Sequence, residues 1–227
     1  MTTARRPLLI VGAGGFARET AAAVAELDGL DLLGFLDDDE AKHGRTVDGI
    51  TVLGPTDAVA DHPEAQVVVC VGSPKGYHTR RLLVERLALP DEQYGTVVHP
   101  AASIGRGCTI GAGSVLLAGV VMTTAVQVGR HVTSMPSVTL THDDVIGSYV
   151  TFGSGVRLGG STIVGDGAYL GAGALVREGC TIGRGALIGM GAVVLADVPE
   201  GEVWAGAPAR YLRPAPAPVL ATLEPAP

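Results

Sequence analysis

His142 is the side chain of this sequence best suited to acid–base chemistry, and Asp143 follows it directly. Imidazole changes charge near neutral pH, so it can take a proton from an amine or a hydroxyl as that group attacks a carbonyl carbon. A carboxylate beside the ring can orient it and stabilise the imidazolium. The pair predicts a general base, and a solvated His–Asp corner is the alternative.

Three glycines near the amino terminus have the spacing of a loop that holds phosphate. Gly12 ends the apolar run of residues 7–12, Gly14 and Gly15 follow it, and a helical pattern begins at Phe16. Glycines at such a turn let the backbone come close to a phosphate, which the N–H groups at the start of the helix then bind. A single glycine loop of this kind is only weak support for phosphate binding.

Charged residues follow the next two apolar runs. Asp37 comes directly after residues 31–36, with Asp38 beside it, and an acidic residue at this point commonly meets a ribose. Lys75 and Arg80 follow residues 67–71 and either face a pyrophosphate or are surface charges. Together these residues predict a nucleotide site, with an acidic solvated turn as the alternative.

Strands and helices in alternation position this nucleotide site. The three apolar runs predict buried strands, and residues 16–27 and a segment that ends near Leu89 predict helices. Strand, glycine turn and helix in this order predict an α/β, Rossmann-like domain over residues 1–95.

His142 belongs to a second pattern, in which every sixth residue is a large apolar one. The series runs in one phase from Val98 to Val194, and Ser134 is its only polar member. Glycine often follows the apolar residue, and the fourth residue after it is almost always small. A period of six predicts a flat-sided solenoid in which three hexads make one triangular coil of 18 residues. We therefore expect a parallel β-helix over residues 96–199.

The coil length relates two further residues to His142. Gly160 lies 18 residues after His142 and is expected to stack over it, where its N–H can stabilise an oxyanion, or where it only serves a turn. Asp144 occupies a small, inward place, where a carboxylate is costly unless it is hydrogen-bonded. We expect it to bond turn amides and stiffen the corner, to compete with Asp143 for the ring, or to turn outward.

Composition narrows the class of protein. Of 227 residues, 47% are hydrophobic, 4% are aromatic and 33 are glycine, which suits a solenoid more than a helical core. A net charge of −7 without a basic stripe argues against nucleic acid as a partner. Three cysteines without metal spacing, and a first apolar run too short for a signal peptide or a membrane span, predict a soluble, cytoplasmic protein.

Five segments together resemble the hexapeptide-repeat sugar O- and N-acyltransferases, in the branch of sialic acid O-acetyltransferase and the N-acetyltransferases of nucleotide-linked 4-amino sugars. They are GAGGFARET at 12–20, FLDDD at 35–39, VVHPAASIG at 97–105, THDDVIG at 141–147 and DVPEGEVWAGAPAR at 197–210. The resemblance implies a left-handed β-helix, a homotrimer with acetyl-CoA as co-substrate between neighbouring helices, and a nucleotide sugar on the N-terminal domain. It implies no metal and no acyl-enzyme.

The resemblance also assigns roles to particular residues. It implies that His142 is the base, that Asp143 is its partner, and that the Gly160 amide meets the acyl carbonyl. Thr151 stands where the amino-sugar branch often has a second His that touches the acyl donor. The residues implied to contact CoA at the family's G-x-P-A-[KR] ending are Ala205, Gly206 and Arg210, and those implied to bind the nucleotide sugar are Gly12, Gly14, Gly15, Phe16, Asp37, Asp38 and Lys75.

Two departures leave the acceptor open. Thr151 replaces the second His, and Phe16 stands where the branch often has a His in the glycine-rich loop. O-acylation therefore remains open beside N-acylation. Residues 200–227 are expected to combine a CoA-contacting segment with a flexible tail from residue 214.

Three other functions compete with this interpretation. A γ-class carbonic anhydrase shares the solenoid but needs three His ligands. A non-catalytic scaffold with a nucleotide-binding half is the second, and an NAD enzyme, for which the first half is short, is the third.

Overall fold

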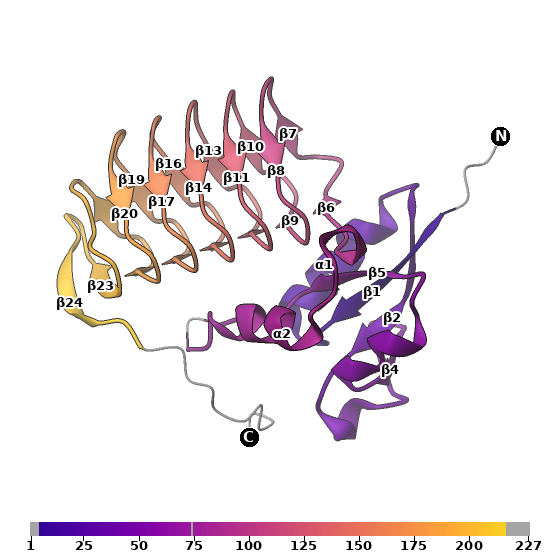
Figure 1. The fold of residues 1–227 in the computed structure, drawn as a ribbon. Helices are drawn as coiled ribbons and strands as arrows, with labels where there is room; N and C mark the ends of the chain where they lie inside the picture. The colour runs from indigo at the N-terminus through magenta and orange to yellow at the C-terminus, as the bar shows by residue number, and fades with distance from the viewer. Residues whose placement is uncertain (1–4, 74, 217–227) are drawn as a thin grey trace.

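The described chain forms an α/β domain followed by a left-handed parallel β-helix (Figure 1). The sequence pattern predicts both domains, and the family resemblance implies the handedness. The structure is a computed structural model and describes residues 5–73 and 75–216. The expected tail from residue 217 onward lies outside the described residues. None of the helices in the described part of the chain is long and apolar enough to cross a membrane.

The N-terminal domain is a five-stranded sheet in the order β3-β4-β2-β1-β5. Its strands are β1 (Arg6–Val11), β2 (Leu30–Leu36), β3 (Thr46–Val47), β4 (Ile50–Gly54) and β5 (Gln66–Val69), and all neighbours are parallel except β3 and β4. The helices are α1 (Gly15–Ala25) and α2 (Thr79–Leu87), with short 3-10 helices at Glu40–Lys42, Thr56–Asp61 and Asp91–Gln93. The three predicted strands and two predicted helices are present, whereas β3 and β4 are additional.

Two-residue strands form the β-helix. They are β6 (Val97–Val98), β7 (Ser103–Ile104), β8 (Thr109–Ile110), β9 (Val115–Leu116), β10 (Val121–Met122), β11 (Gln127–Val128), β12 (Thr133–Ser134), β13 (Thr139–Leu140), β14 (Val145–Ile146), β15 (Thr151–Phe152), β16 (Arg157–Leu158), β17 (Ile163–Val164), β18 (Tyr169–Leu170), β19 (Leu175–Val176), β20 (Thr181–Ile182), β21 (Leu187–Ile188) and β22 (Val193–Val194). Longer strands β23 (Glu202–Ala205) and β24 (Arg210–Pro214) close it.

From β6 to β22, every third strand belongs to the same side of the prism. The β6 sheet holds β6, β9, β12, β15, β18, β21, β23 and β24; the β7 sheet holds β7, β10, β13, β16, β19 and β22; the β8 sheet holds β8, β11, β14, β17 and β20. Neighbouring strands pair residues that are 18 apart, as Met122 pairs with Leu140. The 18-residue coil is therefore confirmed.

The six-residue series forms the interior of the prism. Most of its members are buried in one continuous core, from Leu116 to Val194. The members in the first coil are less buried, because no coil covers it: Val98 and Ile110 are partly buried, and Ile104 has 38% of its surface exposed. Ser134 is fully buried, and its hydroxyl has no hydrogen-bond partner among the described residues.

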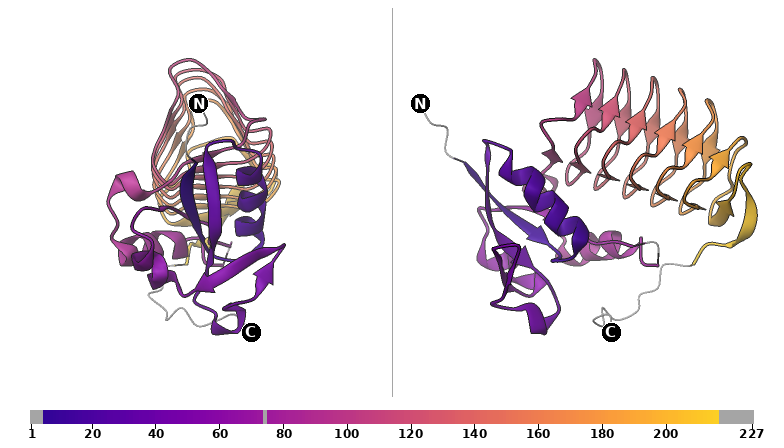
Figure 2. Two further views of the ribbon diagram at one scale, coloured as in Figure 1. Left: turned by 90° about the vertical axis from the view of Figure 1, so that its right-hand side faces the viewer. Right: turned by 180° about the vertical axis from the view of Figure 1, so that it is seen from behind.

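The N-terminal domain packs against the outer face of the β6 sheet. End-on, the coils enclose a triangle, and the domain lies against one part of it (Figure 2). Val97, Val115 and Leu117 share a core with α1 and β1, and the Tyr77 hydroxyl donates to the Gly185 carbonyl at 3.0 Å. The corner between the β7 and β8 sheets lies across the prism from this contact.

A hairpin ends the described chain. Leu187 pairs with Val203, which is 16 residues on, so the last coil is two residues shorter than the others. β24 then runs antiparallel to β23, and the Ala215 amide donates to the Gly201 carbonyl at 2.7 Å. Residues 214–216, expected as the start of a flexible tail, are thus tied to the last coil.

Candidate active site

His142 lies at a corner of the prism, in the turn from β13 to β14. Its Nδ1 is 2.9 Å from Oδ2 of Asp143, and 61% and 62% of the two side chains are exposed. A carboxylate accepts hydrogen bonds, so Nδ1 carries the hydrogen and Nε2 is left as the basic atom. The pair therefore has the tautomer that a general base needs.

Gly160 lies in the next coil, directly beside the imidazole. The Ser161 amide donates to the His142 carbonyl at 2.8 Å, and a Cβ on Gly160 would collide with Cε1 and Nε2 of the ring. The Gly160 N–H has no acceptor among the described residues. The expected stacking is present, and the amide is free to bind a ligand next to Nε2.

Asp144 lies under the same corner and is fully buried. Its carboxylate accepts the Thr141 amide at 2.7 Å and the Thr162 amide at 2.9 Å, which joins two coils. Burial raises the pKa of Asp144 to about 6, although both amides act in the opposite direction. Of the three expectations, bonding to turn amides is the one found, since Asp143 and not Asp144 contacts the ring.

Thr151 lies far from His142 within one chain. It points outward from β15 on the β6 sheet, where its hydroxyl accepts a hydrogen bond from Arg80 at 2.8 Å. Together with Phe16 it lines a cavity of about 140 Å³ between the two domains. The structure thus brings Thr151, which is implied to contact the acyl donor, close to Phe16, which is implied to bind the nucleotide sugar.

The glycine loop connects β1 to α1 as predicted. Gly12 has φ +101°, and a Cβ there would lie 2.8 Å from the Cys70 carbonyl oxygen, so the close approach requires glycine. Gly14 caps α1, which begins at Gly15 and includes Phe16. The N–H groups of its first turn are available for a phosphate.

Asp37 and Asp38 are engaged by their own chain. Asp37 accepts the Ala13 amide of the glycine loop at 2.9 Å and pairs with Lys42 at 3.1 Å. Asp38 accepts the Thr56 amide at 2.9 Å and pairs with Arg86 at 3.0 Å. Burial raises the pKa of Asp38, but the hydrogen bonds from Thr56 and Arg86 outweigh it and hold the pKa below its usual range. Both carboxylates shape the loops at this edge of the sheet.

The remaining predicted site residues lie at two other places. Lys75 is exposed in the loop between β5 and α2. Ala205 ends β23, Gly206 follows with φ +94°, and Arg210 begins β24 with an exposed side chain. These three residues lie at the corner between the β6 and β7 sheets. His142 lies at the corner between the β7 and β8 sheets, so the two groups do not meet within one chain.

Arg80 is the residue for which the surface-charge alternative is wrong. Its side chain is only 1% exposed and lies between the two domains. Nη2 donates to the carbonyls of Tyr149 and Val150, at 3.0 and 3.2 Å, as well as to Thr151. Burial lowers its pKa to about 10. The burial of Arg80 could not be predicted from the sequence, because nothing in the sequence indicates that α2 packs on the β-helix.

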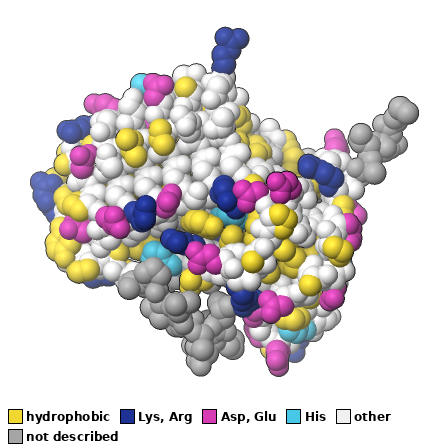
Figure 3. Space-filling view, in the orientation of Figure 1, with side chains coloured by type: hydrophobic (Ala, Val, Ile, Leu, Met, Phe, Trp, Pro, Cys, Tyr) yellow, Lys and Arg dark blue, Asp and Glu magenta, His cyan; other side chains and the backbone are white. Residues whose placement is uncertain are grey.

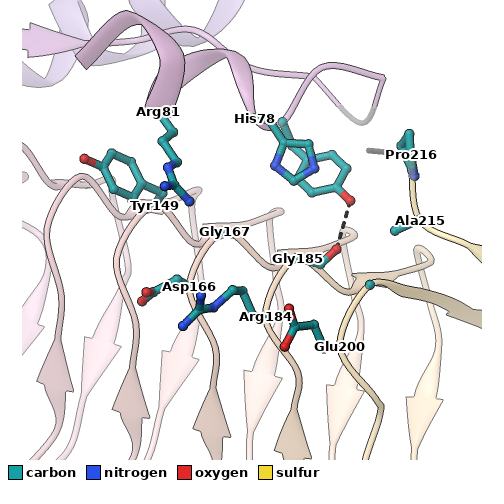
Figure 4. Close-up of a pocket in the computed structure, with 12 residues that line it drawn as sticks. His78, Arg81, Tyr149, Asp166, Gly167, Arg184, Gly185, Glu200, Ala215 and Pro216 are labelled. Carbon is teal, nitrogen blue, oxygen red and sulfur yellow. Dashed lines mark hydrogen bonds between the residues drawn. The ribbon is translucent and has the colours of Figure 1, made fainter. Parts of the chain in front are cut away.

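A second cavity, of about 210 Å³, was not predicted at all. It lies where the start of α2 meets the turns between the β8 and β6 sheets. His78 and Arg81 point from the α2 side toward Asp166 and Arg184 of the turns (Figure 4). Charged side chains gather along the boundary between the two domains on this face (Figure 3).

The histidines that a metal site would need are dispersed. His142 is at the exposed corner, His131 is buried against Tyr94 and Tyr149, and His99 pairs with Glu26. No group of three potential metal ligands occurs among the described residues.

Comparison with known proteins identifies both halves. Residues 7–87 match the PglD N-terminal domain family, and residues 161–196 match the bacterial transferase hexapeptide family of six repeats. Comparison with curated proteins gives no match.

Solved structures resemble this chain across both domains. The acetyltransferase domain of PglB from Neisseria gonorrhoeae FA1090, in complex with acetyl coenzyme A, has a TM-score of 0.82 at 28% identity, over 92% of this chain and 100% of that chain. WeeI from Acinetobacter baumannii AYE has a TM-score of 0.76 at 29% identity, over 90% and 99%. PerB from Caulobacter crescentus, in complex with CoA and GDP-perosamine, has a TM-score of 0.80 at 25% identity, over 91% and 97%.

One family match lies in each domain, in the order that the structure shows, and the similar structures span the junction between the domains. The chain therefore combines a PglD-type N-terminal domain with a hexapeptide-repeat β-helix, and over both domains it resembles sugar acetyltransferases.

Proposed function

We propose that the protein transfers an acetyl group from acetyl-CoA to the amino group of a nucleotide-linked amino sugar, with His142 as general base. The observation that carries this is the exposed imidazole, bonded to Asp143 at 2.9 Å and seated against Gly160. Similar proteins bind the corresponding ligands: the PglB domain binds acetyl coenzyme A, and PerB binds CoA and GDP-perosamine.

In the proposed reaction the amine attacks the thioester carbonyl directly. Nε2 of His142 takes the amine proton, and the Gly160 N–H stabilises the oxyanion. The tetrahedral intermediate then expels CoA, whose sulfur receives the proton from the imidazolium. Asp143 holds the ring and stabilises its charged form. No acyl-enzyme is needed, and burial raises the pKa of the Cys70 thiol to about 12, which makes it a poor nucleophile.

A second copy of the chain completes the site in this proposal. His142 and the substrate loops of the N-terminal domain lie on different sides of one prism, so a homotrimer would bring the corner of one subunit to the domain of its neighbour. Apolar side chains face outward on the β-helix: Val145 is 40% exposed, Ile163 50% and Leu175 41%. Subunit packing would remove them from water.

The remaining predicted residues have places in this arrangement. Gly12, Gly14, Gly15, Phe16 and Lys75 would contact the nucleotide sugar from three loops, with Asp37 and Asp38 at the same edge of the sheet. The segment with Ala205, Gly206 and Arg210 would contact CoA. We place the enzyme in the cytoplasm, in keeping with its three free cysteines.

Transfer to a sugar hydroxyl is the second candidate. It is favoured by Phe16 and Thr151, since neither offers the imidazole that the amino-sugar branch often has at these places. The same base and the same amide serve either acceptor, because a hydroxyl loses its proton as an amine does.

A CoA-release screen tests the proposal. Acetyl-CoA is offered with UDP-, GDP- and dTDP-linked amino sugars and with the matching hydroxyl sugars, and the free thiol is measured. We expect release with one amino sugar and a loss of about 100-fold or more in His142→Ala. Release that is independent of every acceptor, or unchanged in His142→Ala, contradicts it.

A further inference from the structure

The cavity between Phe16 and Thr151 has an unusual polar lining. Four of its side chains are polar, namely Ser73, Arg80, Thr133 and Thr151, and no acidic residue is found among its described lining residues. Apolar and aromatic side chains, including Met135 and Tyr169, form the rest. The cavity therefore combines an apolar wall with one positive charge.

Arg80 supplies that charge without a counter-ion. Its side chain is 1% exposed, and no carboxylate of a described residue lies within 4.0 Å of it. Its Nη2 bonds only neutral oxygens, two carbonyls and the Thr151 hydroxyl. Nε of Arg80 is buried and has no hydrogen-bond partner among the described residues. The neutral acceptors of Nη2 leave the charge uncompensated, and a buried charge is costly unless it is paired.

Two hydroxyl groups of the lining, those of Thr151 and Ser73, each accept one hydrogen bond and keep a hydrogen that can donate. Arg80 has no acceptor atom, so Oγ1 of Thr151 accepts from it and the single hydroxyl hydrogen points elsewhere. Ser73 likewise accepts, at 3.2 Å, from the Gly76 amide. The cavity thus offers a guanidinium and two hydroxyl donors, which is the complement of a group rich in negative oxygens.

We propose that this cavity binds an anionic oxygen group of the acceptor, with Arg80 as its counter-charge and the Thr151 hydroxyl as a donor. That the anion belongs to the acceptor rests on the proposed function. Two sources share this chemistry, the diphosphate of a nucleotide sugar and a carboxylate on the sugar itself. The apolar wall from Phe16 to Tyr169 leaves room for a ring beside the anion.

Direct binding measures this apart from catalysis. Calorimetry on the wild-type full chain, without acetyl-CoA, compares UDP, GDP and dTDP with uridine, guanosine and thymidine, and glucuronate with glucose. We expect one anion to bind about 10-fold or more tightly than its neutral counterpart, because a charge-assisted bond is added. Preference for the diphosphates identifies the phosphate source, and preference for glucuronate identifies the carboxylate source.

Variants then assign the preference to this cavity. Arg80→Gln should lose about 30-fold or more in affinity for the preferred anion, and Arg80→Lys should lose less because it keeps the charge. Thr151→Val, which keeps the shape, should lose about 5-fold. If Arg80→Gln does not fold, as judged by thermal unfolding, Thr151→Val and the salt dependence of wild-type binding provide the test.

Two results overturn the proposal: equal binding of anionic and neutral ligands, or folded Arg80→Gln and Thr151→Val proteins that bind the anion like the wild type. The proposed function fails differently. If the anions bind as expected but no acceptor causes CoA release, the anion site stands and the transferase assignment falls.

Discussion

The ring of His142 occupies the space in which a side chain of Gly160 would begin, one coil further along the β-helix. Residues 18 apart stack because each coil has that length, so the spacing in the sequence sets the spacing in the site. A base and a free amide thus meet on a rigid corner, without a loop that must order first. Such pre-organisation is what general acid–base catalysis needs.

Gly160→Ala should therefore lower kcat with little effect on folding. The new methyl group collides with the ring, and the exposed ring moves away. A displacement of this kind costs about 100-fold in rate. Gly29→Ala is the matched control, since a Cβ there meets nothing within 4 Å. Steady-state kinetics and thermal unfolding of both variants check this, and full activity in Gly160→Ala would contradict it.

Asp143→Asn should impair the base more than Asp144→Asn does. An amide in place of the Asp143 carboxylate can donate to Nδ1, which shifts the hydrogen to Nε2 and removes the basic atom. We expect a loss of about 10-fold or more in kcat for Asp143→Asn. The pH–rate profiles of both variants give the readout. An equal or greater loss in Asp144→Asn would make the buried carboxylate the orienting group.

His131 should make the fold sensitive to acid. It is fully buried beside Tyr94 and Tyr149, and burial lowers its pKa to about 4, whereas the unfolded chain keeps the usual value of 6.5. Below pH 6.5 the unfolded state takes up a proton that the folded state refuses, so stability falls as pH falls. The loss between pH 7.5 and pH 5 is about 2 kcal/mol.

The variant that tests this is His131→Phe, which keeps a ring between the two tyrosines. Urea unfolding at pH 5 and pH 7.5, at one protein concentration, should show the wild type losing about 2 kcal/mol relative to the variant. Parallel pH dependence in the two proteins would mean that the ring titrates normally.

Asp144 should give the stability of the fold a pH dependence opposite to that from His131. Its pKa is about 6 in the folded state and 3.8 in the unfolded chain, so the folded state holds the proton more tightly. This contribution to stability is complete below about pH 4 and is lost as pH rises through 6, a change of about 2 kcal/mol between pH 4 and pH 7. Asp144→Asn cannot ionise and should lack this loss. Urea unfolding of the variant and the wild type at both pH values gives the comparison.

Mixed trimers should reveal whether the site is shared. His142→Ala removes the base, and Gly12→Ala damages the loop of the N-terminal domain, where a Cβ meets the Cys70 carbonyl oxygen at 2.8 Å. If the site lies between subunits, co-expression of the two inactive proteins restores activity to about a quarter of wild type, because a random neighbour supplies the intact half. Activity no greater than that of the separate variants would place the whole site in one chain.

The coil, its interior and the His142–Gly160 stacking could be predicted because they depend only on periodicity. A six-residue repeat fixes which residues face inward and which lie one above another, so even the buried place of Asp144 followed from it. Ile104 shows where this reasoning ends, since its exposure depends on being in the first coil.

Contacts between the domains could not be predicted in this way. Arg80 has the sequence context of a surface helix, and only the packing of α2 on the β-helix turns it into a buried charge. β4 differs from these contacts, because Ile50, Thr51 and Val52 are β-branched residues typical of a strand, and the strand could have been predicted. Asp37 was predicted for a ribose, but its bond to the Ala13 amide depends on how two loops meet.

The reversed strand β24 has a consequence for the molecule as a whole. A stack of parallel coils ends in unpaired backbone groups, and such an end can recruit another molecule and grow into a filament. Here β24 runs antiparallel along the edge of the β6 sheet and carries Arg210 and Arg213 on an exposed strand. Charged side chains on an edge strand disfavour pairing with a further strand, so this end of the stack is protected against end-to-end growth.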